Sequence, residues 1–522
     1  MFSFKRVLAL GLVFSAIGVV FSGCWLQSGN ESGDSSRSNT FIFAQSSDPL
    51  KIDPHRITDN FSTNVNANVY EGLYAFEGDS PNPVPRLAVS YELSDDGCVY
   101  TFELKKGVKF HDGSEFNASV VKRNIDRTLE GSPTRTPDME YPRVIYGDVS
   151  SVETENPHEV KIKLKKPDSS FIAKLSMPLG SGFISPKSLD EAKDNDVSNN
   201  PIGTGPFAVE SWEKGSCVKL KRNENYHDEK RKSKFEHLVI KTISDPAMCI
   251  AALKNKEIDA TSIDSSYEDV VKKDGNKVLS FTSYLTSYMI FNPNLSQEVR
   301  RAISQSIDFE KLVKSLYKGK AEVANSFLLK GLSGYIEDAG YPKYDPNSAK
   351  QIFESNKITT LNMDAYSVSK PYNSIGGKAL AEAVAGELSK VGVEVKQTIS
   401  DWPAYVKKLG GGNYGEIAFC GWHADYADSS NMLNLFTSDN AINYARFNNK
   451  EYDSFLKETQ TLPFGDPKRA QIFTGLDKIL AKDLPIRTIS HETMLIGTLS
   501  NVENFKMPPV GIPNFNEVYK SQ

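Results

Sequence analysis

The chain has 522 residues, of which 39% are hydrophobic, 10% aromatic and 24% charged. This balance is typical of a soluble globular protein and excludes a polytopic membrane protein, a collagen-like chain and a mostly disordered chain. The net charge is −5, from 61 basic and 66 acidic residues. The chain therefore lacks the excess of positive charge that is typical of proteins that bind nucleic acid. At ~150 residues per domain, the length predicts about three domains.

The beginning of the chain predicts an export signal. Two basic residues precede the apolar segment 7–21, which is short for a membrane span but suits a signal core. Small residues then precede Cys24, a pattern that resembles a bacterial lipobox, although Phe21 stands where leucine is usual. We therefore expect residues 1–23 to be removed and Cys24 to carry lipid, with 24–40 as a polar tether. The alternative is an ordinary secretory signal followed by an incidental cysteine.

Periodic patterns predict hairpins in the first part of the body and alternating strands and helices in the second. Asn117 or Ser119 is expected to cap one helix, and Asp308 another. Together these patterns predict an α/β protein of two lobes, with an α+β insertion in the first. The other predicted elements are a strand from 41, hairpins over 91–109 and 152–164, a rigid connector over 201–207, strands over 218–222, 238–243, 257–261, 393–398 and 417–420, and helices over 247–254, 297–306, 379–391 and one ending at 405–409.

The residue types that hold metals or perform catalysis form no known pattern. Four cysteines follow the tether (Cys98, Cys217, Cys249 and Cys420) without CxxC spacing, and they could form up to two disulfides in an exported protein. The seven histidines are scattered without ligand spacing, and no HExxH, GxSxG or P-loop motif is present. We therefore expect no cofactor and no enzymatic activity.

An ordered set of motifs resembles the family 5 extracytoplasmic solute-binding proteins, the peptide and nickel binders of ABC transporters. The longest match is 87–127, which contains SDDG, an alternating strand and LKKGVKFHDG before a capped helix. The resemblance extends over 41–522. The shorter matches are DPH at 53–55, VYEGL at 69–73, GTGPF at 203–207, NENY at 223–226, AAL at 251–253, EID at 257–259, VRRAI at 299–303, ID at 307–308, YDP at 344–346 and GWHADY at 421–426.

This resemblance implies a two-lobed periplasmic-binding-protein clamp with an extra domain inserted in the first lobe. The implied divisions are lobe I (41–78, 195–284 and 492–522), an inserted α+β subdomain (79–194) and lobe II (285–491). It also implies a monomer, anchored to a membrane through lipid at Cys24 and facing the periplasm or the extracellular side. That monomer would enclose short peptides and deliver them to permease subunits powered by cytoplasmic ATPases.

The GWHADY motif holds the strongest candidate ligand-binding residues. By resemblance, Asp425 pairs with the α-ammonium of a peptide. A carboxylate in a closed, water-poor cleft needs such a cationic partner. Trp422 would line a side-chain pocket or belong to the core. Gly421 belongs to the same motif, and His423 is expected near the mouth of the site, with a solvated ring as the favoured interpretation.

Other candidates come from separate segments. Tyr288 matches a cleft tyrosine of peptide-binding relatives, and Asn443 would come from the opposite wall. Thr58 and Asn60 lie in a segment that matches one that pairs with peptide backbone, a mode that accepts many sequences. Packing or a solvated loop is the alternative for each. Oligopeptide binders often place cations before the GW motif for the peptide carboxylate, but 410–420 contains none.

Three other functions stay open. The same fold could bind a cell-wall peptide, a nickel complex, haem or a sugar. A surface adhesin or chaperone could reuse the scaffold, and a hydrolase could assemble scattered Ser, His and Asp residues in three dimensions.

Overall fold

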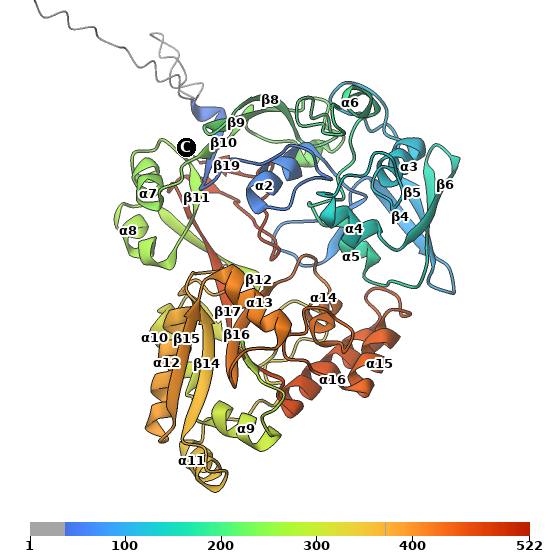
Figure 1. Ribbon diagram of the computed structural model, residues 1–522. Coiled ribbons are helices and arrows are strands. Elements are labelled where there is room, and N and C mark those ends of the chain that lie inside the picture. Colours follow the sequence, from blue (N-terminus) through green and yellow to red (C-terminus); the bar gives the residue numbers. More distant parts are fainter. Residues whose placement is uncertain (1–36, 371, 522) are drawn as a thin grey trace, which may run out of the picture.

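A computed structural model describes residues 37–370 and 372–521, and its fold is mixed α/β (Figure 1). An 11-stranded sheet has the order β15-β14-β16-β12-β17-β11-β1-β10-β9-β8, with β13 beside β17. Its strands are β1 (Thr40–Gln45), β8 (Phe207–Glu213), β9 (Cys217–Arg222), β10 (His237–Thr242), β11 (Ala260–Ile263), β12 (Lys277–Phe291), β13 (Ala321–Val323), β14 (Thr360–Tyr366), β15 (Glu394–Ser400), β16 (Ile417–His423) and β17 (Ile486–Thr498).

Two long strands connect the two halves of this sheet. β12 and β17 pair antiparallel along most of their length, and their pairing shifts register between Thr282 and Leu285. Such an irregularity bends a strand pair locally. β17 pairs with β11 toward one end, and β12 pairs with β16 toward the other. Figure 1 shows β12 and β17 passing from the half that contains β1 to the half that contains β14 to β16.

Each half of the sheet has its own hydrophobic core. Tyr405, Phe419 and Leu480 are buried in the cluster around β14 and β16. Phe41 and Phe515 are buried in the cluster around β1 and β10. β10 alternates buried and partly exposed positions, whereas β1 is buried at five of its six positions.

A separate four-stranded antiparallel sheet has the order β4-β5-β7-β6. Its strands are β4 (Ala88–Leu93), β5 (Val99–Leu104), β6 (Val149–Asn156) and β7 (Glu159–Leu164). Phe102 and Ile162 are buried in its core, and Tyr426, which follows β16, is buried in the same cluster. The buried Ser169 hydroxyl also donates to the Thr459 carbonyl at 2.8 Å. The small sheet therefore contacts the half of the large sheet that contains β16.

Local capping explains where several helices begin. The Asn117 side chain accepts from the Val120 amide at 3.2 Å, and Asp308 accepts from Lys311 at 3.0 Å. Asn117, rather than Ser119, is thus the cap of α3, and the predicted cap of α10 is confirmed. The helices are α2 (Asn60–Val69), α3 (Ala118–Asp126), α4 (Glu140–Tyr146), α5 (Phe171–Leu175), α6 (Pro186–Glu191), α7 (Pro246–Lys254), α8 (Glu268–Lys273), α9 (Gln297–Gln305), α10 (Phe309–Tyr317), α11 (Pro346–Ser355), α12 (Gly377–Lys390), α13 (Trp402–Gly411), α14 (Ser429–Leu433), α15 (Lys450–Thr459) and α16 (Pro467–Asp483).

The remaining elements are short. Two pairs of short strands are β2 (Tyr74–Phe76) with β3 (Pro83–Pro85) and β18 (Val502–Glu503) with β19 (Tyr519–Lys520). The 3-10 helices are η1 (Glu229–Arg231), η2 (Ser265–Tyr267) and η3 (Asn434–Phe436).

Within the described ranges, no helix is both long and apolar enough to cross a membrane. Cys98, Cys249 and Cys420 are free thiols, so no disulfide joins any two of the four cysteines after the tether.

Candidate ligand-binding site

β16 has one edge that is only partly paired. Its whole length pairs with β12, but on its other side β14 reaches only Ile417 and Ala418. The Tyr405 hydroxyl then binds both the amide and the carbonyl of Phe419, at 2.8 and 2.6 Å. Because alternate residues of a strand direct their backbone groups to opposite edges, Gly421 and His423 point to the same side as Phe419. In the described part of the chain, no backbone group pairs with their amides there, so this edge is open to an extended ligand.

Asp425 lies just beyond the open edge. Pairing of β16 ends where the Ala424 amide donates to the Tyr284 carbonyl at 3.0 Å. The Tyr141 hydroxyl lies 3.5 Å from Asp425 Oδ1, and the side chain of Asn431 also binds this carboxyl. Burial raises the pKa of Asp425 to about 6, although both hydrogen bonds oppose the rise. No lysine or arginine of the described residues forms an ion pair with Asp425, so its charged form lacks a cationic partner.

Asn431 links Asp425 to Trp422. The Trp422 indole N–H donates to Asn431 Oδ1 at 2.9 Å, and the ring packs against the core around β16. Asn431 belongs to α14, whose cap Asp428 forms a buried ion pair with Arg469 at 3.0 Å. A capped helix therefore fixes the amide that orients both predicted residues. Trp422 thus packs on the core, as one interpretation expects, while its role in lining a side-chain pocket stays a prediction.

His423 is only partly exposed, so its ring is less solvated than the favoured interpretation expects. Burial lowers its pKa to about 4, although a hydrogen bond with the backbone of Val510 opposes this shift. Its Nε2 atom is shielded from solvent and has no hydrogen-bond partner among the described residues. His423 is therefore neutral at pH 7 and contributes a fixed polar group rather than a charge.

A loop after β14 packs on one face of Gly421 and brings a cation close to Cys420. A side chain at Gly421 would collide with the Tyr372 ring, which packs directly on this glycine. Lys370, from the same loop, places Nζ 3.9 Å from the ring centroid of Trp402. Partial burial lowers the pKa of Lys370, and no carboxylate in the described ranges pairs with it. Lys370 is not among the residues predicted from the sequence, because the resemblance places such a cation on the strand just before the GW motif.

Of the remaining predicted residues, Tyr288 borders this cluster, because it pairs with Cys420 of β16 and its hydroxyl hydrogen-bonds that residue. The buried Tyr288 ring packs edge-on against Phe327 and Phe436, with centroids 5.5 and 6.0 Å away. The Asn443 amide donates to the carbonyls of Thr437 and Phe447 and accepts from the Phe447 amide, so it holds its own loop together.

Two further residues lie at the start of α2. Thr58 and Asn60 are exposed there, around the cap Asp59, and no contact joins them to Asp425. Cys24 lies outside the described residues. The roles predicted for these positions stay predictions.

Comparisons with known proteins identify the relatives of this chain. The profile of the bacterial extracellular solute-binding proteins, family 5 Middle, matches residues 82–444. The chain is 28% identical over 512 residues to di/tripeptide-binding protein 1 of Pseudomonas aeruginosa, covering 92% of this chain and 94% of that protein. It is also 28% identical over 513 residues to heme-binding protein A of Haemophilus influenzae, covering 92% of each.

A solved structure shows the same fold. HbpA2 from Haemophilus parasuis superimposes with a TM-score of 0.85 at 24% identity, covering 93% of this chain and 100% of that one. The predicted fold class is thereby confirmed. At this identity the likeness concerns the fold and leaves the ligand to be argued from the side chains around β16.

Proposed function

Because this chain belongs to the family 5 bacterial extracellular solute-binding proteins, we propose that it binds short peptides and delivers them to an ABC permease. The observation that carries the proposal is the position of Asp425 at the end of the open edge of β16. The carboxylate supplies the charge that a peptide α-ammonium requires. The edge supplies backbone groups that pair with any peptide, whatever its side chains. The name of the Pseudomonas relative supports the same ligand class.

The two ends of the site set the length of the ligand. Asp425 would hold the ammonium group, Gly421 and His423 would pair with the peptide backbone, and Lys370 would attract the terminal carboxylate. From 421 to 425 the chain spans four residues, on the order of 13 Å at ~3.3 Å per residue. A peptide of about three residues fits this length. Trp422 would provide a flat wall that accepts different side chains.

The surrounding architecture supports enclosure of the ligand. We assign residues 41–78, 195–284 and 492–522 to one lobe and 285–491 to the other, with 79–194 inserted in the first. The contact of Tyr426 with the core of the small sheet holds 79–194 against the lobe formed by 285–491.

The mass of the exported chain would show whether Cys24 carries the proposed lipid anchor.

Titration calorimetry with blocked peptides tests this function. We expect trialanine to bind the purified protein, and N-acetyl-trialanine to bind at least about 30-fold more weakly, because acetylation removes the charge that pairs with Asp425. Amidation of the carboxyl end should weaken binding about three- to tenfold, since Lys370 is only partly buried. Equal affinity for the acetylated peptide would contradict the proposal. Exclusive binding of haem, a nickel complex or a sugar would assign another ligand to the same fold.

The affinity for peptides should depend on pH through Asp425. Only the ionised carboxyl attracts an ammonium group, and the free protein has an Asp425 pKa of about 6. At pH 5 about one Asp425 in ten is ionised, so binding should be about tenfold weaker at pH 5 than at pH 7.5. Calorimetric titrations of trialanine across this range measure the effect.

The matched control for this pH dependence is Glu492. Burial raises the pKa of Glu492 to about 7, so this group titrates in the same range. The Glu492→Gln variant should keep the fall in affinity below pH 6. His423 and His491 have pKa values of about 4 and stay neutral over the range. Affinity that is constant between pH 7.5 and 5 would show that Asp425 does not bind the ammonium group.

A further inference from the structure

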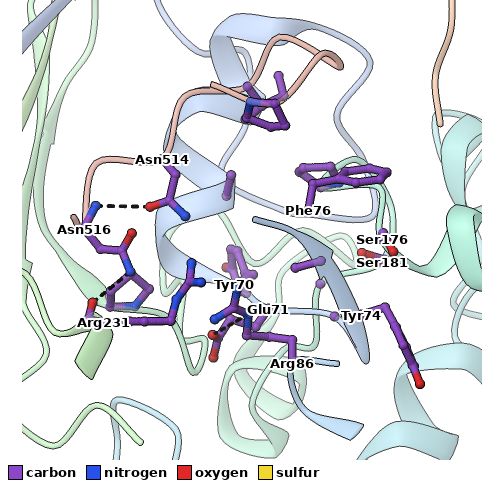
Figure 2. A pocket seen from close by; sticks show the side chains of 18 of the residues that line it. Tyr70, Glu71, Tyr74, Phe76, Arg86, Ser176, Ser181, Arg231, Asn514 and Asn516 are labelled. Carbon is purple, nitrogen blue, oxygen red and sulfur yellow. Dashed lines mark hydrogen bonds and ion pairs between the residues drawn. The ribbon is translucent and has the colours of Figure 1, made fainter. Parts of the chain in front are cut away.

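A cavity of about 90 Å³ is lined by Glu71, Arg86 and Arg231 (Figure 2). It is enclosed by the end of α2, the loop 176–182 and the C-terminal segment 508–516. Figure 2 shows Arg231, Asn514 and Asn516 on one side, and Phe76, Ser176 and Ser181 on the other. One water molecule needs only ~10–15 Å³ of such space. The cavity can therefore hold a small side chain.

Two segments that line this cavity also reach residues around the ligand-binding site. The C-terminal segment that lines it also contacts His423 through the backbone of Val510. The same segment accepts a hydrogen bond from the Tyr284 amide at the Pro509 carbonyl, at 3.0 Å. The loop 176–182 contains Gly180, which packs against the backbone of Tyr141, the residue beside Asp425. A peptide on the open edge of β16 therefore lies close to the cavity.

Arg86 is an incompletely paired guanidinium in the cavity wall. Its exposed fraction is 7%, and its one ion pair joins Nε to Glu71 Oε1 at a loose 3.9 Å. No hydrogen bond from its side chain is found within the described residues. A guanidinium carries five N–H donors, and leaving them unsatisfied in the interior is unfavourable. Because Glu71 lies on the Nε side, the two terminal nitrogens remain for another partner.

Glu71 does not pair with the terminal nitrogens of Arg86, because both carboxylate oxygens of Glu71 already accept hydrogen bonds from other residues. The Tyr226 hydroxyl donates to Oε1 at 2.7 Å, and Oε2 contacts His227 at 2.7 Å and the Thr204 hydroxyl at 2.9 Å. Burial favours its neutral form, but His227, Arg86 and Tyr226 hold the pKa of Glu71 down at about 2. Glu71 is thus a fixed anion that keeps Arg86 charged and in place.

Two more polar atoms of the cavity wall lack partners. Arg231 pairs through one terminal nitrogen with Glu77 and Glu517, but its buried Nε has no partner in the described structure. Asn516 donates to the Arg231 carbonyl at 2.8 Å, while its Oδ1 is buried and unpaired. Arg231 and Asn516 are only 8% and 2% exposed. The cavity therefore offers unused donors from two arginines, and the acceptor of Asn516 suits a bound water or amide.

We propose that this cavity is a side-chain subsite that accepts an acidic residue of the bound peptide, with Arg86 as the residue that binds its carboxylate. The planar guanidinium fork matches a carboxylate in geometry and charge. Arg231 Nε would add a second donor. The proposal rests on the peptide-binding function proposed above, because the subsite has meaning only for a ligand held at Asp425.

Calorimetry with paired peptides tests the subsite. Ala-Glu-Ala and Ala-Ala-Glu are compared with Ala-Gln-Ala and Ala-Ala-Gln, which differ only in the charge of one side chain. We expect the wild-type protein to bind one of the Glu peptides at least about tenfold more tightly than its Gln counterpart. In the Arg86→Gln variant this preference should fall below about twofold, while the Gln peptides still bind.

The controls separate the subsite from the function and from the fold. The Arg123→Gln variant removes an exposed arginine paired with Asp190 and should keep the preference. Arg86→Lys keeps the charge but loses the fork, so an intermediate preference is expected, and it replaces Arg86→Gln if that variant does not fold. Peptide binding without preference for Glu, or with a preference unchanged in both Arg86 variants, would overturn the subsite alone. Failure of every peptide to bind would overturn the proposed function instead.

Discussion

The Asp425→Asn variant is expected to bind trialanine roughly 30- to 1000-fold more weakly than the wild-type protein. Removing one partner of a buried charge pair costs about 2–4 kcal/mol of binding free energy. Asparagine keeps the size of the side chain and can still accept hydrogen bonds from Tyr141 and Asn431, so the change isolates the charge. Calorimetric titration at pH 7.5 measures the loss.

The same variant should be more stable than the wild type when no ligand is bound. The pKa of Asp425 rises from 3.8 to about 6 on folding, so the folded state binds the proton more tightly than the unfolded state. The stabilisation from the protonated group is complete below pH 4 and is lost as pH rises through 6. Above pH 6 the ionised group therefore destabilises the fold by on the order of 3 kcal/mol. Asparagine removes this penalty.

Urea denaturation at pH 7.5 and at pH 4 measures this gain. The free energy of unfolding should exceed that of the wild type by about 1–3 kcal/mol at pH 7.5 and by almost nothing at pH 4. Asp439→Asn, a change at an exposed loop position, is the matched control and should alter neither binding nor stability. If Asp425→Asn bound trialanine more weakly but were no more stable than the wild type, Asp425 would not be a buried carboxylate that lacks a cationic partner in the free protein.

Local signals in the sequence were sufficient for many elements but not for the strands that connect the two halves. The cap at Asp308 and the hairpin over 91–109 depend on contacts between residues close in the sequence, so their patterns are readable along the chain. β12 was missed as a strand, because its second half is buried on both faces and shows no alternation. Its partner β17 lies about 200 residues later, and such pairing has no local signature.

The candidate site shows the same division between local and distant contacts. Asp425 and Trp422 were identified because they belong to one short motif that resembles a family. The residues that make them act together come from elsewhere: Tyr141 lies 284 positions before Asp425, and Lys370 belongs to a loop after another strand. Arg86 stands one residue before the longest matched region, 87–127, and belongs to none of the matched motifs. Only its burial and its loose contact with Glu71 show that it lacks a partner.

The Gly421→Ala variant is expected to lose roughly 2–4 kcal/mol of stability and most of its peptide binding. A Cβ at this position would lie 2.5 Å from the Thr286 carbonyl oxygen of β12 and would collide with the Tyr372 ring. The carbonyl belongs to the strand pair itself and cannot move without shifting β16. A shift of β16 would displace the edge that is proposed to pair with the peptide backbone.

Gly410→Ala is the matched control for this glycine. Gly410 lies in α13, and a Cβ there would meet no atom within 4 Å. Alanine in an open helical position should stabilise the protein by about 0.5–1 kcal/mol. Urea denaturation and trialanine titration of both variants give the comparison. If Gly421→Ala were as stable as Gly410→Ala and bound trialanine normally, Tyr372 and β12 could not pack on Gly421 as described. The open edge of β16 would then not be the surface that peptides pair with, because the close packing on Gly421 fixes the position of that edge.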